Sequence, residues 1–346
     1  MNLYFQSAIK YVLTQGDSLL ISNLTTLSVQ GSYALASNYG GLIARMLFQP
    51  LEDTSRNLFA KLCAPATAPA PAASSPSASD PSTSASSSSG KETTAAGPSP
   101  TNLTQAATTL TLLLHLYSLL TLAFWSLGPP LAPSLLTLIA GPRWSTTSAP
   151  LVLATYAYYI PLLAINGVTE AFVAATATAA ELRTQSALMT VWFVAFAGVA
   201  YVTLAVWEWG AQGLVWANVV NMACRIGYNV VFVRRFFGRF GARWEVRRAM
   251  PRVGSVAASV GVGAVLRARM GSAEGTGVVG ELVRAGAVVV MWVAIVAVSE
   301  RALVLRVMAM VKGLGAKSEK SRENGGSGGK GGDGMQKSQS EGKKEL

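Results

Sequence analysis

Residues 31–62 read GSYALASNYGGLIARMLFQPLEDTSRNLFAKL, an apolar stretch long enough to cross a membrane as one helix. It nevertheless carries Asn38, Arg45, Glu52 and Arg56, spaced seven, seven and four residues apart. Because successive residues of an α-helix are about 100° apart, this spacing predicts that all four lie on one narrow face. A charge at the centre of a bilayer costs at least about 2.5–3.5 kcal/mol, so this face should contact protein or water. The stripe is the first candidate for a substrate path.

The composition of the whole chain indicates a membrane protein. Apolar residues make up 51% of the sequence and charged residues only 13%, and several segments reach the about 20 residues that span a hydrocarbon core. We therefore predict an all-α, polytopic membrane bundle of about eight transmembrane helices and not a soluble globular domain. The expected spans, each accurate to a few residues, are 8–27, 32–60, 103–127, 150–176, 187–207, 212–233, 253–268 and 282–300. The span at 253–268 is short and rich in small residues, so either a tightly packed membrane helix or a surface hairpin fits it.

The same pattern divides the chain into segments. Two stretches are too poor in large apolar residues to offset chain entropy and are expected to be disordered and cytosolic: 63–101, rich in Ala, Pro, Ser and Thr, and 313–346, rich in Gly, Ser and Lys. The other segments are 1–6, a possible tag remnant or misassigned start; 7–62, two helices; 102–235, four helices; 236–252, a basic cytosolic loop; and 253–312, a C-terminal helix pair.

The distribution of lysine and arginine predicts the orientation, because cytosolic loops retain these residues. A cytosolic C-terminus leaves only Arg143, Arg267 and Arg269 on the opposite side. The cytosolic set is Arg56, Lys61, Lys91, Arg183, Arg234, Arg235, Arg239, Arg243, Arg247, Arg248 and Arg252. This asymmetry accounts for most of the net charge of +11 without a nucleic-acid partner, and the arginines of 234–252 fit anionic membrane lipids.

A second polar face lies in the span at 212–233. Asn218, Asn221, Arg225 and Asn229 follow one another at i, i+3, i+7 and i+11. Counting residues places Arg225 near the middle of the bilayer, level with Arg45, and two guanidinium groups at one depth suggest an anion site.

Acidic and amide side chains accompany these arginines. Asp17 lies in the first span, and Asn166 and Glu170 lie one turn apart in the fourth. Two interpretations stay open. The arginines either pair with Asp17, Glu52 or Glu170 and lock the bundle, or the same groups line a cavity that binds a phosphate-bearing headgroup.

The sequence contains no signature of catalysis. It has no glycine-rich phosphate loop, no nucleophile elbow and no His or Cys cluster with metal spacing, so we expect no enzyme activity, no cofactor and no metal. His115 stands alone in an apolar helix, where a packed, hydrogen-bonded residue is the usual role.

Four separated blocks resemble one family in the right order. They are YVLTQGDSLLIS at 11–22, the whole 31–62 block, PLLAINGVTEAFVAATAT at 161–178 and GAQGLVWANVVNMACRIGYN at 210–229. Together they resemble the Rft family of oligosaccharide-lipid translocation proteins, within the multidrug/oligosaccharidyl-lipid/polysaccharide flippase superfamily. The resemblance implies a place in the endoplasmic reticulum membrane and in N-glycosylation, where the substrate is the dolichyl-pyrophosphate-linked Man5GlcNAc2. Val29 departs from the family pattern, which has an acidic residue there.

The resemblance also suggests roles for the polar residues. Arg45 and Arg225 would face the pyrophosphate, and Asn38, Asn218 and Asn221 would offer partners to sugar hydroxyls. The expected charge-balancing or gating residues are Asp17, Glu52, Arg56, Glu170 and Asn166.

Family members have about fourteen spans, so the chain resembles the second lobe with the extra helix pair. Its expected partners are the N-terminal lobe of the same protein, membrane lipids and the lipid-linked oligosaccharide. Two alternatives remain open: a cation-coupled exporter of the same superfamily, and a non-transporting organiser of lipid-linked oligosaccharide assembly.

Overall fold

The structure is a computed structural model that describes residues 20–65, 97–270, 278–303 and 305. Every regular element in these ranges is a helix, which confirms the predicted all-α class. Asp17, most of the first predicted span, most of the 63–101 insert, residues 1–6 and the 313–346 tail lie outside the described residues.

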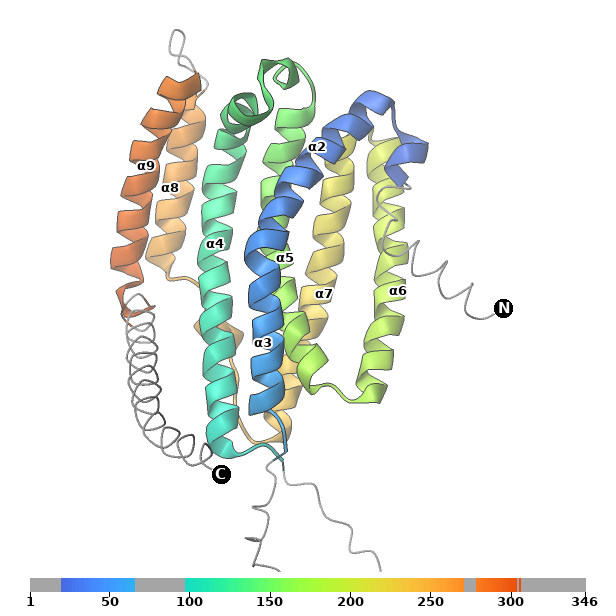
Figure 1. Ribbon diagram of the computed structural model, residues 1–346, viewed down its shortest axis with the longest axis vertical. Coiled ribbons are helices and arrows are strands. Elements are labelled where there is room, and N and C mark those ends of the chain that lie inside the picture. The colour runs from blue at the N-terminus through green and yellow to red at the C-terminus, as the bar shows by residue number, and fades with distance from the viewer. Residues whose placement is uncertain (1–19, 66–96, 271–277, 304, 306–346) are drawn as a thin grey trace, which may run out of the picture.

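The helices stand side by side, with α8 and α9 at one edge and α6 at the other (Figure 1). The elements in chain order are α2 (Leu27–Ile43), the π-helix η1 (Ala44–Phe48), α3 (Gln49–Leu62), α4 (Pro100–Ala140), η2 (Pro142–Trp144), α5 (Ala149–Thr176), α6 (Ala179–Tyr201), the π-helix η3 (Val202–Val206), α7 (Ala211–Arg239), η4 (Val246–Ala249), α8 (Val253–Met270) and α9 (Val278–Ser299).

Four of these helices are long and apolar enough to cross a membrane. They are α4, α5, α6 continued through η3, and α9. They make the described part a multi-pass membrane bundle. Each of the other predicted spans from 32–60 onward also falls on a helix. The hairpin alternative for 253–268 is excluded, because α8 is one continuous helix.

Two predicted boundaries are wrong. The helix expected to end near residue 127 continues as α4 to Ala140, through Pro129, Pro130 and Pro133. Prolines disfavour a helix interior, but Ala132 and Leu136 beyond them are buried, and this packing outweighs the local preference. The helix expected from 187 begins at Ala179, because Thr178 and Glu181 form a capping box there.

The long helix of residues 27–62 is bent at η1. Pro50 has no backbone N–H to donate to the carbonyl of Met46, and just before it the N–H of Gln49 donates to Ala44 C=O, five residues back. Figure 1 shows α2 leaning away from the axis of α3 beyond this point. The π-helix therefore turns the segment that carries Arg45 relative to the one that carries Glu52.

The core joins α3, α5 and α7 through aromatic residues. Phe172 of α5 lies with its ring centre 5.1 Å from that of Phe59 and 5.4 Å from that of Phe237, and all three are fully buried. Edge-to-face contacts of this kind add to the energy of burial. This core holds the three helices that carry the polar residues described below.

One end of the bundle collects most of the described arginines, and we call it the basic end. There α3 and α7 end, α4 begins and α5 connects to α6, at the bottom of Figure 1. Arg234, Arg235 and Arg239 lie at this end of α7. Arg143 lies in the loop between α4 and α5 at the opposite end. The basic residues predicted to share one side thus share one end of the bundle.

The contact between α4 and α5 leads to a prediction about stability. A Cβ added to Gly128 would lie 2.5 Å from the Cβ of Ala157, and neither atom can rotate away. Gly128→Ala should therefore separate the two helices and cost about 1–3 kcal/mol. The measurement is the melting midpoint of the detergent-solubilised protein. Gly198→Ala is the control, because nothing lies within 4 Å of its added Cβ. Equal midpoints for the two variants would contradict the prediction.

Candidate functional site

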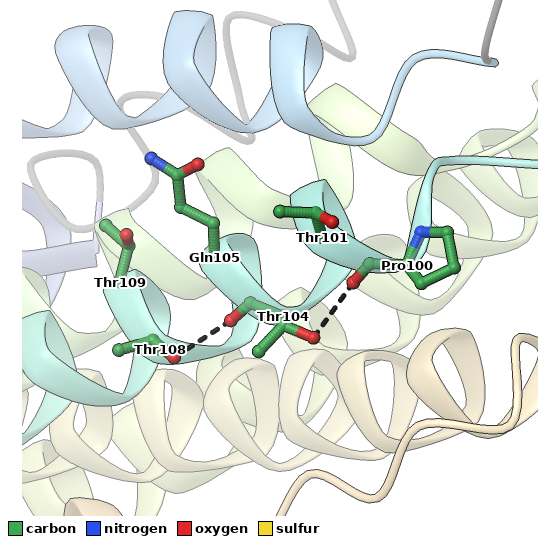
Figure 2. Close-up of a pocket in the computed structure, with 6 residues that line it drawn as sticks. All are labelled: Pro100, Thr101, Thr104, Gln105, Thr108 and Thr109. Carbon is green, nitrogen blue, oxygen red and sulfur yellow. Dashed lines mark hydrogen bonds between the residues drawn. The ribbon is translucent and has the colours of Figure 1, made fainter.

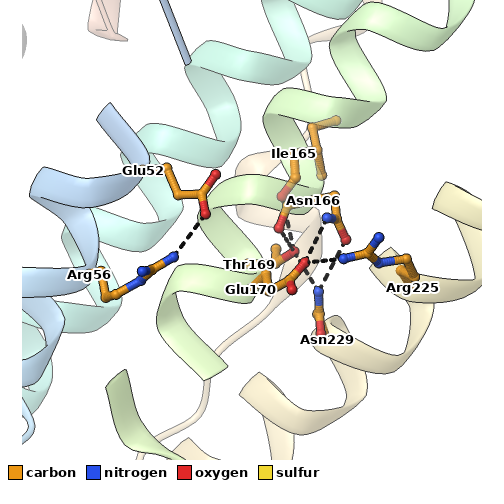
Figure 3. Close-up of polar contacts among 8 residues, drawn as sticks. All are labelled: Glu52, Arg56, Ile165, Asn166, Thr169, Glu170, Arg225 and Asn229. Carbon is orange, nitrogen blue, oxygen red and sulfur yellow. Dashed lines mark hydrogen bonds and ion pairs between the residues drawn. The ribbon is translucent and has the colours of Figure 1, made fainter. Parts of the chain in front are cut away.

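A cluster of polar side chains joins α5 to α7 inside the bundle (Figure 3). Nη2 of Arg225 donates to Oε2 of Glu170 at 2.6 Å. Nδ2 of Asn166 donates to the same carboxylate oxygen at 2.8 Å. We call Asn166, Thr169, Glu170, Arg225 and Asn229 the α5–α7 polar cluster. A charge-assisted bond this short is among the stronger polar contacts that a protein makes.

The deeper part of the α5–α7 polar cluster is neutral and almost completely buried. Nδ2 of Asn229 donates to Oγ1 of Thr169 at 3.2 Å and to Oδ1 of Asn166 at 3.4 Å. The hydroxyl of Thr169 in turn donates to backbone carbonyls of α5. Asn166, Thr169 and Asn229 are 6%, 0% and 1% exposed. Buried polar groups without partners are costly, so this network fixes the register of the two helices.

One donor of the α5–α7 polar cluster is left open. Nε of Arg225 is buried, yet it has no hydrogen-bond partner among the described residues. Buried donors without an acceptor are uncommon and call for an explanation. Arg225 thus has one nitrogen bound to Glu170 and another that can accept a further anionic or carbonyl oxygen.

The spacing of these residues in the sequence explains the arrangement. Asn166 and Glu170 are four residues apart on α5, and Arg225 and Asn229 are four apart on α7, so each pair shares a helix face. The predicted pairing of an arginine with Glu170 is confirmed for Arg225. Thr169 was not predicted, because a threonine hydroxyl in a helix commonly bonds only to its own backbone.

Glu52 and Arg56 form a second ion pair beside α5. Arg56 donates from Nη2 to Oε1 of Glu52 at 3.0 Å. A Cβ on Gly167 would lie 2.7 Å from Oε2 of Glu52, so the carboxylate reaches the backbone of α5 only because glycine stands there. In Figure 3 this pair lies on one side of the labelled α5 residues and Arg225 lies on the other. Acidic groups therefore approach α5 from α3 as well.

The remaining predicted residues are placed separately. Nδ2 of Asn218 donates to the hydroxyl of Tyr33 at 3.5 Å and so connects α7 to α2. Arg45 and Asn38 are exposed, and Asn221 is half-buried. No hydrogen bond or ion pair within the described ranges joins Arg45 to the α5–α7 polar cluster. The predicted pairing of Arg45 with Glu52 or Glu170 is wrong, because Glu52 pairs with Arg56 and Glu170 with Arg225.

A cavity of about 610 Å³ lies along the first turns of α4 (Figure 2). It is lined by Pro100, Thr101, Thr104, Gln105, Thr108 and Thr109. The hydroxyls of Thr104 and Thr108 donate to carbonyls of the same helix at 2.9 and 2.8 Å. With no charged side chain in its lining, this cavity is a poor match for a pyrophosphate.

A further buried polar group was not predicted. Glu300, at the end of α9, lies with Oε2 3.3 Å from Nε2 of His115 on α4, and its Oε1 accepts from the backbone N–H of Arg252 at 2.7 Å and from the hydroxyl of Ser255 at 2.9 Å. These contacts attach α8 and α9 to α4. Spacing could not reveal them, because the partners are far apart in the sequence. The interpretation of His115 as a packed residue with polar partners is confirmed.

Comparison with known proteins agrees with this picture. A family model described as "Rft protein" matches residues 1–310. The chain is 33% identical over 243 residues to the Man(5)GlcNAc(2)-PP-dolichol translocation protein RFT1 of Yarrowia lipolytica, a match that covers 68% of this chain and 32% of the relative. The protein of the same name from Candida albicans is 34% identical over 239 residues, covering 68% of this chain and 39% of the relative.

The protein of that name from mouse is 29% identical over 238 residues, covering 68% of this chain and 39% of the relative. The match thus spans about a third of the length of the curated relatives. No solved structure matches the chain. The family model covers nearly the whole chain, from the first residue to the end of the C-terminal helix pair, and the chain therefore belongs to the Rft family.

Proposed function

We propose that the whole protein containing this chain takes part in moving the dolichyl-pyrophosphate-linked Man5GlcNAc2 across the endoplasmic reticulum membrane, or in making it available on the luminal side, for N-glycosylation. The relatives from yeast to mouse carry the name of that translocation. The observation in this chain that best supports the proposal is Arg225, an arginine inside a membrane bundle with a buried donor still open.

Arg225 suits a pyrophosphate for chemical reasons. Guanidinium groups bind phosphate oxygens through paired, directed hydrogen bonds. In the structure one nitrogen is occupied by the carboxylate of Glu170, an anion that a phosphate could replace. Glu170 would then keep Asn166 as a donor. We propose that Glu170 holds Arg225 in place when no substrate is bound.

Arg45 offers a second cationic group. It lies exposed on the π-helix η1, and no described residue forms an ion pair with it. An unpaired arginine is unfavourable against lipid, so this face calls for protein or substrate opposite it. We propose that the rest of the protein completes a cavity there, with Asn38, Asn218 and Asn221 facing sugar hydroxyls. Glu52, Arg56 and Asn166 balance the charge beside it, and Asp17 would do so from the first span.

The helix lengths suggest the depth of this site. His115 is fifteen residues from Pro100 and Arg225 is fourteen from Arg239, so both lie about 21–22 Å above the basic end. The contact of His115 with Glu300 puts the end of α9 at that same level. Since α9 can span the membrane from there, we propose that the α5–α7 polar cluster lies close to the boundary on the basic side and not at mid-depth. By the positive-inside rule that side, and the C-terminus with it, is cytosolic.

Reconstitution tests the proposal directly. The full-length protein in liposomes with defined lipid-linked oligosaccharide should change the sidedness of that lipid faster than protein-free liposomes. Unchanged sidedness together with co-purification of assembly enzymes would favour the organiser function. Ion-dependent uptake of other solutes without any response to the glycolipid would favour the exporter.

Neutralising Arg45 should impair function. In the full-length protein Arg45→Gln removes a charge-assisted contact worth about 1.5–3 kcal/mol, which corresponds to a roughly 10- to 100-fold loss of affinity. The measurement is the glycosylation of a reporter protein in a strain that lacks the endogenous protein. Arg143→Gln, at the opposite end of the bundle, is the control and should leave glycosylation normal. Normal glycosylation with Arg45→Gln at normal expression would reject this role.

A charge swap separates a structural role of the Arg225–Glu170 pair from a binding role. Arg225→Glu alone should lower stability, by less than the about 3–5 kcal/mol of a fully buried pair because the side chains are 23% and 27% exposed. Adding Glu170→Arg restores an ion pair, so the melting midpoint should recover. Glycosylation should stay low, because the guanidinium now extends from α5. Recovery of both would show that the pair only stabilises the bundle.

A further inference from the structure

A groove separate from the α5–α7 polar cluster lies between α6 and α7. The two helices approach closely at the end opposite the basic end, where a Cβ on Gly213 would lie 2.7 Å from Cβ of Thr203. Toward the basic end they leave a cavity of about 720 Å³, lined by residues between Glu181 and Trp192 and between Cys224 and Arg239. We call this cavity the α6–α7 groove. Its volume is within the about 300–1,000 Å³ of small-molecule sites.

The inner wall of the α6–α7 groove is apolar and aromatic. The rings of Trp192 and Tyr228 meet edge to face across it, with centres 5.7 Å apart. Leu188 and Val231 also line the groove, and Val231 is 45% exposed. Gly227 leaves one side open, since nothing lies within 4 Å of its added Cβ. These surfaces suit a hydrocarbon chain that enters from the side.

The mouth of the α6–α7 groove, at the basic end, is cationic. Arg239 of α7 forms an ion pair with Glu181 of α6, and the other carboxylate oxygen of Glu181 accepts the N–H of Thr178 at 2.9 Å. The acid is thus fully engaged. Arg235 also lines the groove, and no described residue forms an ion pair with it. The mouth therefore presents a positive charge with no counterion of its own.

We propose that the α6–α7 groove binds one anionic phospholipid of the surrounding membrane. Its phosphate lies at Arg235, and one acyl chain runs past Val231 toward the rings of Trp192 and Tyr228. The occupant comes from the membrane because α6 is long and apolar enough to span it, so the groove opens toward lipid. The preference for a negative headgroup follows because Glu181, the acid at the mouth, is occupied by Arg239 and cannot bind a choline or amine.

Binding of a fluorescent phosphatidylserine to the purified, delipidated chain tests the proposal. Gly227→Leu fills the groove and Arg235→Gln removes its free charge, so each should weaken binding about tenfold. The matched controls are Gly238→Leu and Arg234→Gln. They change the same residue types on exposed positions of α7 outside the groove and should bind as the parent does. Equal binding by all four variants would overturn the proposal.

The two cysteines of the chain give a second readout that uses no groove-filling variant. Cys224 is exposed in the groove, whereas burial raises the pKa of the Cys63 thiol to about 11 and keeps it slow to react. Phosphatidylserine should slow N-ethylmaleimide labelling of Cys224 in the parent and in Arg234→Gln, and much less in Arg235→Gln. Equal protection by phosphatidylcholine, or protection by dolichyl phosphate alone, would overturn the assignment to an anionic phospholipid.

Discussion

A charge inside a bilayer has no water to solvate it, and this constraint organises the described part of the chain. Glu170 has Arg225 and Asn166, Glu52 has Arg56, and Glu300 has His115 with donors from α8. Each acid is thus matched by a group from its own or a neighbouring helix, and the helices are aligned by these matches as much as by their apolar faces. Where the matching is incomplete, at Nε of Arg225 and at Arg45, the bundle retains binding capacity.

How much of this was visible in the sequence depends on whether a signal is local. The faces of α5 and α7 could be predicted because polar residues recur at intervals of three, four and seven, and a helix converts such intervals into one surface. The continuation of α4 past three prolines could not, because burial of Ala132 and Leu136 outweighs local preference. The contact of His115 with Glu300 joins residues far apart in the chain, and no spacing rule reports such a pair.

The two sites share α7 but use different faces of it. Arg225 and Asn229 turn toward α5, while Cys224, Tyr228 and Arg235 line the groove toward α6. A helix that contacts substrate on one side and membrane lipid on the other would register changes in either. The lipid composition around α6 is thereby placed one helix diameter from the proposed pyrophosphate site.

The π-helix at η1 amounts to one extra residue accommodated in a continuous helix. Removing a residue between Ala44 and Phe48 would return the segment to regular α-helix and rotate everything before it by about 100° relative to α3. Asn38 and Tyr33 would then leave their present directions, while Glu52 and Arg56 stayed where they are. In this region of the chain, length therefore constrains the protein as tightly as residue identity does, and a one-residue deletion in η1 would be as disruptive as a substitution of a charged side chain.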